Sequence, residues 1–461
     1  MIIMALFTTV AAISTAEGKG GIGVVRISGP DAFAVADRVF QPMQGGGFAE
    51  MAGYTAKLGH VTDKNGKRLD QCIGLCFRAP RSYTGEDVAE LQCHGGEAVT
   101  QAVLRAVLDA GAEPAGRGEF TRRAYLSGRI SLTEAEAVMD IISASSLQGQ
   151  RAAVNLADGA LAKEADALRG EILKIQTQIA AEIDFPEEDV EEADRSEIEA
   201  GVSALAQRLG KLISGYDAGQ KLLRGVPAAI VGSPNVGKST LLNRIAGYEK
   251  AIVSGEAGTT RDVLEEQVTL GGVSLILADT AGIRAEAGGE IERIGIGLAR
   301  KKLEQSSLIL AVFDASRPLN DDDRALMADL AGRPVLAVIN KCDLADAGSA
   351  AEVEAAFPRC VRLSAKEPSA LDTLSAAVAE FLGTAHFDAD APLLANERQR
   401  GCAVRAADAV GEASASLFAG ETLDVCYALL DEALGALYEL SGEDASEEVI
   451  DAVFREFCVG K

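Results

Sequence analysis

The chain has 461 residues, enough for roughly two to four domains with cores of their own, and its 48% hydrophobic and 25% charged residues are ordinary globular values. No apolar run is long enough to span a bilayer and the opening residues lack the basic segment of an export signal, so we expect a cytoplasmic protein with no membrane partner. A net charge of −25 argues against a nucleic-acid partner, whose phosphates are bound by Lys and Arg, although residues 1–123 are neutral, with 13 Lys and Arg against 13 Asp and Glu.

Residues 1–121 combine short β-like runs with glycine-rich turns and one helix near residues 97–110. The runs include GIGVVRIS, GYTAKLGHV, CIGLCFRA and DVAELQCH. This pattern predicts an α+β domain.

The eight cysteines are too dispersed for a disulfide framework, which agrees with a reducing compartment. Cys72, Cys76, Cys93 and His94 match no common zinc-ligand spacing. We therefore interpret these cysteines as buried side chains of the predicted strands.

Residues 122–216 have a helical pattern. Ser131 is followed three residues later by Glu134, as in a capping box, and an Ala, Leu, Glu and Lys-rich stretch with apolar residues at helical spacing comes next. The acidic run DFPEEDVEEADRSEIEA is typical of a solvated face, and we assign it no chemistry. Residues 386–461 return to a similar helical composition, which predicts one helical domain interrupted by the segment between.

Residues 217–385 alternate apolar strands with helix-like segments. The runs VPAAIVG, VSLILAD, LILAVFD, PVLAVIN and CVRLSA each lead into a turn. This predicts a parallel sheet with helices on both faces. The fold class is thus a multidomain α+β protein with an inserted α/β domain.

The segment GSPNVGKST, residues 232–240, fits G-x-x-x-x-G-K-[ST] between an apolar strand and a helix. In such a loop the backbone N–H groups wrap the phosphates, Lys238 reaches the β- and γ-phosphates, and the Ser239 hydroxyl ligates Mg²⁺. In DTAG, residues 279–282, Asp279 would lie by the magnesium and the final glycine amide by the γ-phosphate. A phosphoryl-transfer site is therefore predicted.

NKCD, residues 340–343, and SAK, residues 364–366, indicate guanine. Asp343 can accept both N–H groups on the Watson–Crick edge of guanine, and a site built for such bonds rejects an analogue lacking them by roughly 10⁴ to 10⁵. GTTRD, residues 258–262, lies where a switch loop would place Thr260 on magnesium. We therefore expect GTP, held by Asn235, Val236, Gly237, Lys238, Ser239, Thr240, Ser254, Gly255, Glu256, Ala257, Gly258, Thr259, Thr260, Asp279, Thr280, Ala281, Gly282, Asn340, Lys341, Asp343, Ser364, Ala365 and Lys366.

One catalytic group is missing from its usual position. GTPases that orient water with a glutamine carry it directly after the DxxG glycine, and here that residue is Ile283. The water must then be oriented from elsewhere. Glu286, Glu290 and Glu292 in the following loop all qualify.

The sequence ends in FREFCVGK, where Cys458 could be a lipid site, half of a disulfide, a metal ligand or a catalytic group. A prenylation box has aliphatic residues after the cysteine and usually a small or hydrophobic last residue, whereas this tail has Gly460 and Lys461. Neither an oxidising compartment nor a ligand set supports the disulfide or the metal-ligand role. A nucleophilic thiol would need its pKa lowered by a nearby Arg or Lys. The residues alone do not assign a role to Cys458.

The whole chain resembles the MnmE (TrmE) family of bacterial and organellar tRNA modification GTPases. The matching segments, in order, are GGIGVVRISG, YTGEDVAELQCHGG, GEFTRRAYLSGRISLTEAEAVMDII, GSPNVGKSTLLN, VSGEAGTTRD and the cysteine tail. The resemblance implies an N-terminal folate-binding-like domain that forms a homodimer, a helical domain, and an inserted Ras-like GTPase domain.

The resemblance also implies site residues. GTP hydrolysis would be stimulated by K⁺ bound to Asn235, Ser254, Glu256 and Thr259, with Glu292 as the acid that positions water. A tetrahydrofolate derivative, in the 5-formyl or 5,10-methylene form, would bind Arg26, Glu90, Arg129 and Lys461, and Cys458 would lie near it as a catalytic candidate.

The implied reaction installs a 5-aminomethyl or 5-carboxymethylaminomethyl group on the wobble uridine of certain tRNAs. FAD and NADH would come only through a flavoprotein partner, MnmG (GidA), in a heterotetramer. Two alternatives are a ribosome-assembly GTPase, which would carry a KH-type module or second GTPase domain, and a dimerisation scaffold, which needs no folate pocket.

Overall fold

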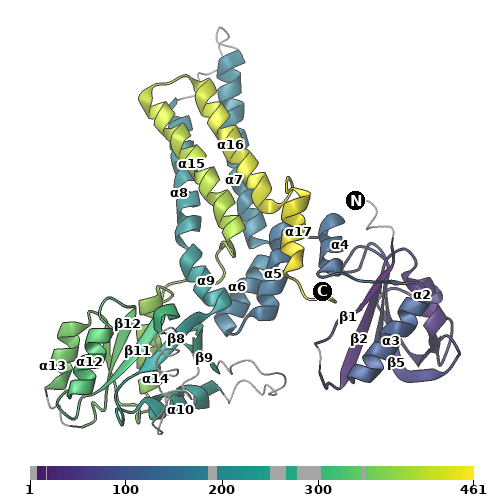
Figure 1. Ribbon diagram of the computed structural model, residues 1–461. Coiled ribbons are helices and arrows are strands. Elements are labelled where there is room, and N and C mark those ends of the chain that lie inside the picture. Colours follow the sequence, from purple (N-terminus) through teal and green to yellow (C-terminus); the bar gives the residue numbers. More distant parts are fainter. Residues whose placement is uncertain (1–7, 17, 185–194, 250–265, 278–302, 345–347) are drawn as a thin grey trace. The chain divides into compact units, whose positions relative to one another are not determined.

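The computed structural model divides into two compact units (Figure 1). One consists of residues 1–139 with 438–461, and the other of residues 140–437. The residues that the structure describes are 8–16, 18–184, 195–249, 266–277, 303–344 and 348–461.

The first unit is built on a seven-stranded sheet with the order β3-β4-β5-β6-β2-β1-β7. Its strand pairs are antiparallel except for the short parallel pair of β1 with β7. This sheet and its helices confirm the predicted α+β domain. The strands are β1 (Val10–Ile13), β2 (Ile22–Ser28), β3 (Phe40–Pro42), β4 (Thr55–Thr62), β5 (Arg68–Phe77), β6 (Val88–His94) and β7 (Glu113–Pro114).

Helices α2 (Ala32–Val39) and α3 (Glu97–Asp109), with the short helix η1 (Phe48–Glu50), pack against this sheet. Their apolar side chains share one buried core with the strands, in which Val103 and Val107 of α3 lie among strand residues. Burial of such side chains stabilises each by about 1.5–3 kcal/mol.

A second cluster of the first unit joins α4 (Glu119–Leu126), the start of α5 (Leu132–Ser143) and α17 (Glu447–Arg455). The capping box is confirmed at α5: the Glu134 amide donates to Ser131 Oγ at 3.2 Å, and the Ser131 amide donates to Glu134 Oε2 at 2.5 Å. The buried side chains of this cluster are Leu132, Ala135, Ile450, Phe454 and Phe457. The end of the chain therefore belongs to the first unit, which its helical pattern did not indicate.

In the second unit, helices from before and after the α/β segment pack together (Figure 1). Arg208 of α8 pairs with Glu164 of α7 at 2.8 Å, and Arg195 of α8 donates to the carbonyl of Leu417 on α15 at 2.8 Å. The helices are α6 (Leu147–Ala157), α7 (Ala160–Asp184), α8 (Arg195–Ser214), α9 (Tyr216–Arg224), α15 (Glu397–Ala419) and α16 (Leu423–Ser441). In the part of the chain that the structure describes, no helix combines the length and apolarity needed to cross a membrane.

The α/β segment forms a six-stranded sheet with the order β13-β12-β11-β8-β10-β9. Five strands are parallel, as predicted, but the edge strand β9 runs antiparallel to β10. The cause is the turn at Gly271 and Gly272, whose φ angles of +63° and +80° suit a two-residue hairpin that can join only antiparallel strands.

Strands β8, β10, β11 and β12 are buried along most of their length, whereas only Val361 of β13 is buried. Helices follow β8, β11, β12 and β13. The strands are β8 (Val226–Val231), β9 (Glu266–Leu270), β10 (Val273–Leu277), β11 (Leu308–Asp314), β12 (Val335–Asn340) and β13 (Cys360–Arg362). The helices are α10 (Lys238–Glu249), α12 (Asp321–Asp329), α13 (Ser349–Ala356) and α14 (Ala370–Leu382). The carboxyl ends of the parallel strands therefore share one edge, where ligands bind in open α/β sheets.

Candidate functional site

The predicted phosphate loop connects β8 to α10. Gly232 and Gly237 have φ angles of +154° and +103°, and a Cβ there would lie 2.4 Å from the Val312 carbonyl oxygen or 2.2 Å from the Asn340 side-chain nitrogen. Both positions therefore require glycine. Asn235 lies between them with φ +64°, an uncommon conformation for a residue with a side chain.

The carbonyl groups of this loop are engaged within the protein. Three side chains donate to four of them: Lys238 Nζ to Gly232 at 2.6 Å and Ser233 at 2.8 Å, Lys341 Nζ to Asn235 at 2.8 Å, and Asn340 Nδ2 to Val236 at 2.8 Å. Because the carbonyls are held in this way, the N–H groups of the loop are the main-chain dipoles left for an anion.

Lys238 is the first residue of α10, and its side chain extends back to the carbonyl groups of Gly232 and Ser233 in the loop. Burial lowers the pKa of its ammonium group. Ser239 and Thr240 follow it in the first turn and are exposed. The loop thus holds a cation, with hydroxyl groups beside it, where the motif places the nucleotide phosphates.

Asn340, at the end of β12, joins the phosphate loop to the predicted base-binding residues. Its side chain is buried, and besides the bond to Val236 its Oδ1 accepts from the Ala365 amide at 2.9 Å. The NKCD and SAK motifs and the phosphate loop are therefore brought together around one amide.

Asp343 is exposed and faces the SAK segment. A hydrogen bond with Ser364 lowers the pKa of the Asp343 carboxyl, and the nearby charges of Lys366 and Lys341 lower it further. The carboxylate is therefore ionised at neutral pH, as hydrogen bonding to the N–H edge of guanine requires.

The other predicted nucleotide residues lie outside the described part of the chain. They are Ser254, Gly255, Glu256, Ala257, Gly258, Thr259, Thr260, Asp279, Thr280, Ala281, Gly282 and Glu292, together with Ile283, Glu286 and Glu290.

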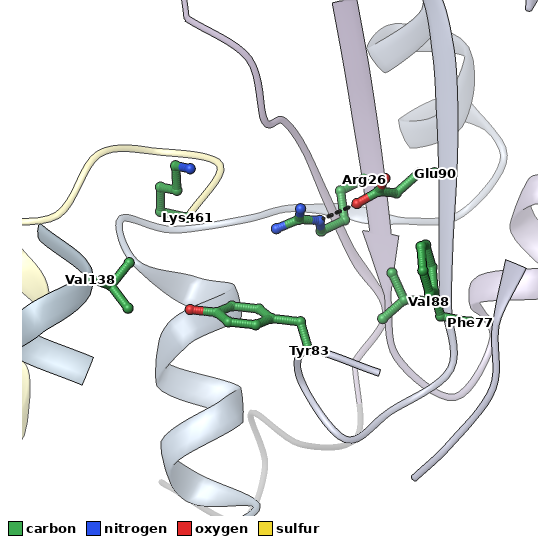
Figure 2. A pocket seen from close by; sticks show the side chains of 7 residues that line it. All are labelled: Arg26, Phe77, Tyr83, Val88, Glu90, Val138 and Lys461. Carbon is green, nitrogen blue, oxygen red and sulfur yellow. Dashed lines mark hydrogen bonds and ion pairs between the residues drawn. The ribbon is translucent and has the colours of Figure 1, made fainter. Parts of the chain in front are cut away.

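A pocket of about 350 Å³ lies in the first unit (Figure 2). Arg26 of β2 and Glu90 of β6 occupy paired positions of the sheet and form an ion pair at 2.8 Å between Nε and Oε1. The Arg26 guanidinium also lies 5.9 Å from the ring centre of Tyr83. The lining residues are Arg26, Phe77, Tyr83, Val88, Glu90, Val138 and Lys461.

Three of the four residues predicted to hold folate thus line one pocket, and Arg129 is not among its lining residues. Arg129 donates instead to the carbonyl of Pro80 at 2.9 Å. Cys458 is exposed and does not line the pocket either.

Main-chain hydrogen bonds hold the C-terminal tail, which carries Lys461, against the rest of the first unit. The Gly118 amide donates to the Cys458 carbonyl at 3.2 Å, and the Phe120 amide donates to the Lys461 main-chain oxygen at 3.0 Å. Gly460 has φ +94°, and a Cβ on it would lie 2.0 Å from the Ile13 carbonyl oxygen. Glycine there lets the tail approach β1 closely enough for Lys461 to reach the pocket.

Cys72, Cys76 and Cys93 are confirmed as buried. Burial raises the pKa of Cys72 to about 12 and that of Cys93 to about 11, so neither offers a thiolate to a metal. His94 is exposed and its Nδ1 lies 2.8 Å from Asp70 Oδ1. Among the described residues no group of three or more His, Cys, Asp or Glu could hold a metal ion.

Two family models match the chain. One, described as the N-terminus of the GTP-binding protein TrmE, covers residues 9–129, and the other, the MnmE helical domain, covers residues 132–458. The second match alone spans more than half of the chain. The chain belongs to the MnmE (TrmE) family.

Full-length relatives support the same membership. Proteins named tRNA modification GTPase MnmE from Symbiobacterium thermophilum and Geobacter sulfurreducens are 41% and 40% identical, each over 98% of this chain and 99% of the relative. That of Geobacter metallireducens is 41% identical over 99% of this chain and all of the relative. A solved structure of Aquifex aeolicus Era bound to GDP·AlF4⁻ is 27% identical over 40% of this chain and 65% of that chain, but its TM-score of 0.25 is too low to support a conclusion.

The motifs of the MnmE family singled out the three charged residues that line this pocket, but none of the other residues that line it. Phe77, Val88 and Val138 are apolar residues with no chemical signal of their own, and Tyr83 stands inside the matching segment YTGEDVAELQCHGG without a role assigned from sequence. The sequence also gave no sign that Asp323 contacts the phosphate loop, because that contact joins residues 90 positions apart.

Proposed function

We propose that this chain hydrolyses GTP and that hydrolysis serves the modification of tRNA at the wobble uridine. The relatives named above are tRNA modification GTPases, and the chain matches them over nearly its whole length. The single structural observation that supports the nucleotide is the Asn340 side chain, which ties the phosphate loop to the base-binding residues.

The residues at the nucleotide site fit two cations. Ser239, exposed at the start of α10, would bind Mg²⁺ together with Thr260. Asn235, exposed with φ +64°, would bind K⁺ together with Ser254, Glu256 and Thr259. These cations would supply positive charge against the phosphates, and Glu292 would orient the attacking water that Ile283 cannot.

We propose the pocket of the first unit as the folate site. Arg26 and Lys461 offer cations that suit the glutamate tail of a 5-formyl or 5,10-methylene tetrahydrofolate, and Glu90 offers a carboxylate that suits the N–H edge of the pterin. The aromatic rings of Tyr83 and Phe77 offer apolar surface to the pterin. The folate would supply the one-carbon unit of the modification.

We propose further that the protein acts in the cytoplasm as a homodimer, with an MnmG (GidA) partner in a heterotetramer. That partner would supply FAD and NADH. The product of the tRNA modification would be the 5-aminomethyl or 5-carboxymethylaminomethyl uridine of certain tRNAs.

The test is complementation. A strain lacking its own copy of this gene would receive the wild-type chain or Lys238→Ala, and the nucleosides of its tRNA would be measured by mass spectrometry. We expect modified wobble uridine with the wild type and none with Lys238→Ala. Absence of the modification with abundant, folded wild-type protein would contradict the proposal and favour the ribosome-assembly or scaffold alternatives.

Folate binding is tested separately by calorimetric titration with 5-formyltetrahydrofolate. Arg26→Ala should abolish binding, whereas Arg105→Ala, an exposed arginine on α3 of the same unit, should leave it unchanged. Lack of binding by the intact wild type would remove the folate assignment alone.

A further inference from the structure

We propose that Asp323 is a positioning residue for GTP hydrolysis, which acts by holding Ser233 at the start of the phosphate loop. This inference rests on the proposed GTPase function. Asp323 lies in the first turn of α12, outside every nucleotide motif of the sequence.

The contact is direct and buried. Ser233 Oγ donates to Asp323 Oδ1 at 2.5 Å, and the two residues are only 6% and 1% exposed. A hydrogen bond from a hydroxyl to a buried carboxylate is stronger than one between neutral groups.

The carboxylate of Asp323 accepts hydrogen bonds both from the N-terminal cap of α12 and from the phosphate loop. Oδ2 accepts from the Asn320 amide at 3.0 Å, which completes the capping box of α12, and from Arg317 Nη1 at 2.7 Å. Oδ1 accepts from Ser233 and, more weakly, from Arg317 Nη2 at 3.3 Å. Capping of the helix needs only Oδ2, the oxygen that accepts from the Asn320 amide. The bond to the phosphate loop is therefore additional to the cap.

The carboxylate keeps its charge in this buried position. Burial acts to raise the pKa of Asp323, but hydrogen bonds from Arg317, Ser233 and the Asn320 amide outweigh it, and the pKa lies below its ordinary value. Arg317 supplies the countercharge at the exposed side of the cluster.

Ser233 occupies the position where the loop leaves the sheet. Gly232 before it is fixed by its close approach to the Val312 carbonyl, and the Ser233 carbonyl accepts from Lys238 Nζ at 2.8 Å. Asp323 thus fixes the side chain of the same residue whose main chain contacts the phosphate-binding lysine. A displacement of this residue would move the N–H groups that follow it and the lysine together.

Such displacements have large effects on reaction rate, because about 1 Å of misplacement can cost roughly 100-fold. Side-chain loss here leaves the main chain in place, so we expect a smaller change of about tenfold in kcat, with a lesser effect on KM. A role confined to the stability of α12 would instead lower the melting temperature and leave kcat of the folded protein unchanged.

The experiment uses the full chain and measures kcat and KM for GTP together with the melting temperature. The variants are Ser233→Ala, Ser233→Thr, Asp323→Asn and the double variant Ser233→Ala with Asp323→Asn. Asp322→Asn is the matched control, since Asp322 is the neighbouring exposed acid in the same helical turn.

We expect Ser233→Ala and Asp323→Asn each to lower kcat about tenfold, and the double variant to lower it no further, because the two residues form one contact. Ser233→Thr, which keeps the hydroxyl, should retain most of the wild-type kcat, and Asp322→Asn should retain all of it. If Asp323→Asn does not fold, the inference is tested by comparing kcat of Ser233→Ala, which we expect to be reduced, with kcat of Ser233→Thr, which we expect to be largely retained.

Wild-type kcat in Ser233→Ala, or additive losses in the double variant, would overturn the inference and leave the proposed function standing. A folded wild type that does not turn over GTP would overturn both.

Discussion

The side-chain amide of Asn340 donates a hydrogen bond to the Val236 carbonyl at 2.8 Å and so ties the end of β12 to the phosphate loop. Asn340→Asp would replace this donor by a buried carboxylate facing a carbonyl oxygen. We expect GTP affinity to fall at least 100-fold and the free energy of unfolding to fall by about 1–3 kcal/mol. Calorimetric titration and denaturant unfolding measure the two effects. GTP binding as tight as that of the wild type would show that the link does not support the site.

Much of this arrangement follows from sequence. Apolar runs followed by turns placed the strands of the α/β sheet, the motif placed the phosphate loop between β8 and α10, and Ser131 with Glu134 marked the start of α5. These features depend on local spacing, which a sequence displays directly.

Other features depend on which surfaces meet, and periodicity does not specify a partner. The apolar face of α17 predicts burial, but the pattern cannot say that it packs with α4 and α5 of the first unit. Likewise Asp323 is recognisable as a helix-capping acid, whereas its second bond to Ser233 appears only in the folded structure.

Asp343 should determine the choice of base. Asp343→Asn replaces one acceptor oxygen by an N–H donor, which no longer matches the N–H edge of guanine but suits the additional carbonyl of xanthine. We expect GTP affinity to fall by roughly 10² or more and XTP affinity to rise. Competition of both nucleotides against a fluorescent GTP analogue measures the change. The control is Asp372→Asn, which changes an exposed acid in the first turn of α14. Retained preference for GTP would assign base recognition to another residue.

Asp314 should make the stability of the α/β segment depend on pH. Burial acts to raise its pKa, but hydrogen bonds from Lys341 and Ser316 outweigh it, and the pKa lies below its ordinary value. Since the folded pKa is below the unfolded value of about 3.9, the ionised Asp314 carboxylate stabilises the folded state above that pH. This contribution is lost as the pH falls through the folded pKa.

Unfolding by denaturant at pH 7, 5 and 3 tests the effect. We expect the wild type to lose stability mainly between pH 5 and 3, and Asp314→Asn to be less stable at pH 7 and less sensitive to acid. Equal acid sensitivity of the two proteins would show that Asp314 does not contribute to the pH dependence.

Gly460 should hold the tail in place. In Gly460→Ala the new methyl group would meet the Ile13 carbonyl oxygen, and the φ angle of +94° would be strained. We expect the tail to detach, so that the Phe120 amide, which donates to the Lys461 main-chain oxygen, exchanges its hydrogen faster. Hydrogen exchange with mass spectrometry follows this amide. Val459→Ala, a change at an exposed neighbour, is the control, and unchanged exchange in Gly460→Ala would contradict the seating of the tail.

We propose that GTP hydrolysis by this chain is stimulated by potassium bound through Asn235. Its most direct measurement is the rate of phosphate release from GTP in matched KCl and NaCl, for the wild type and for Asn235→Ala. We predict faster hydrolysis in KCl for the wild type and no difference between the salts for Asn235→Ala. Equal wild-type rates in both salts would contradict the claim.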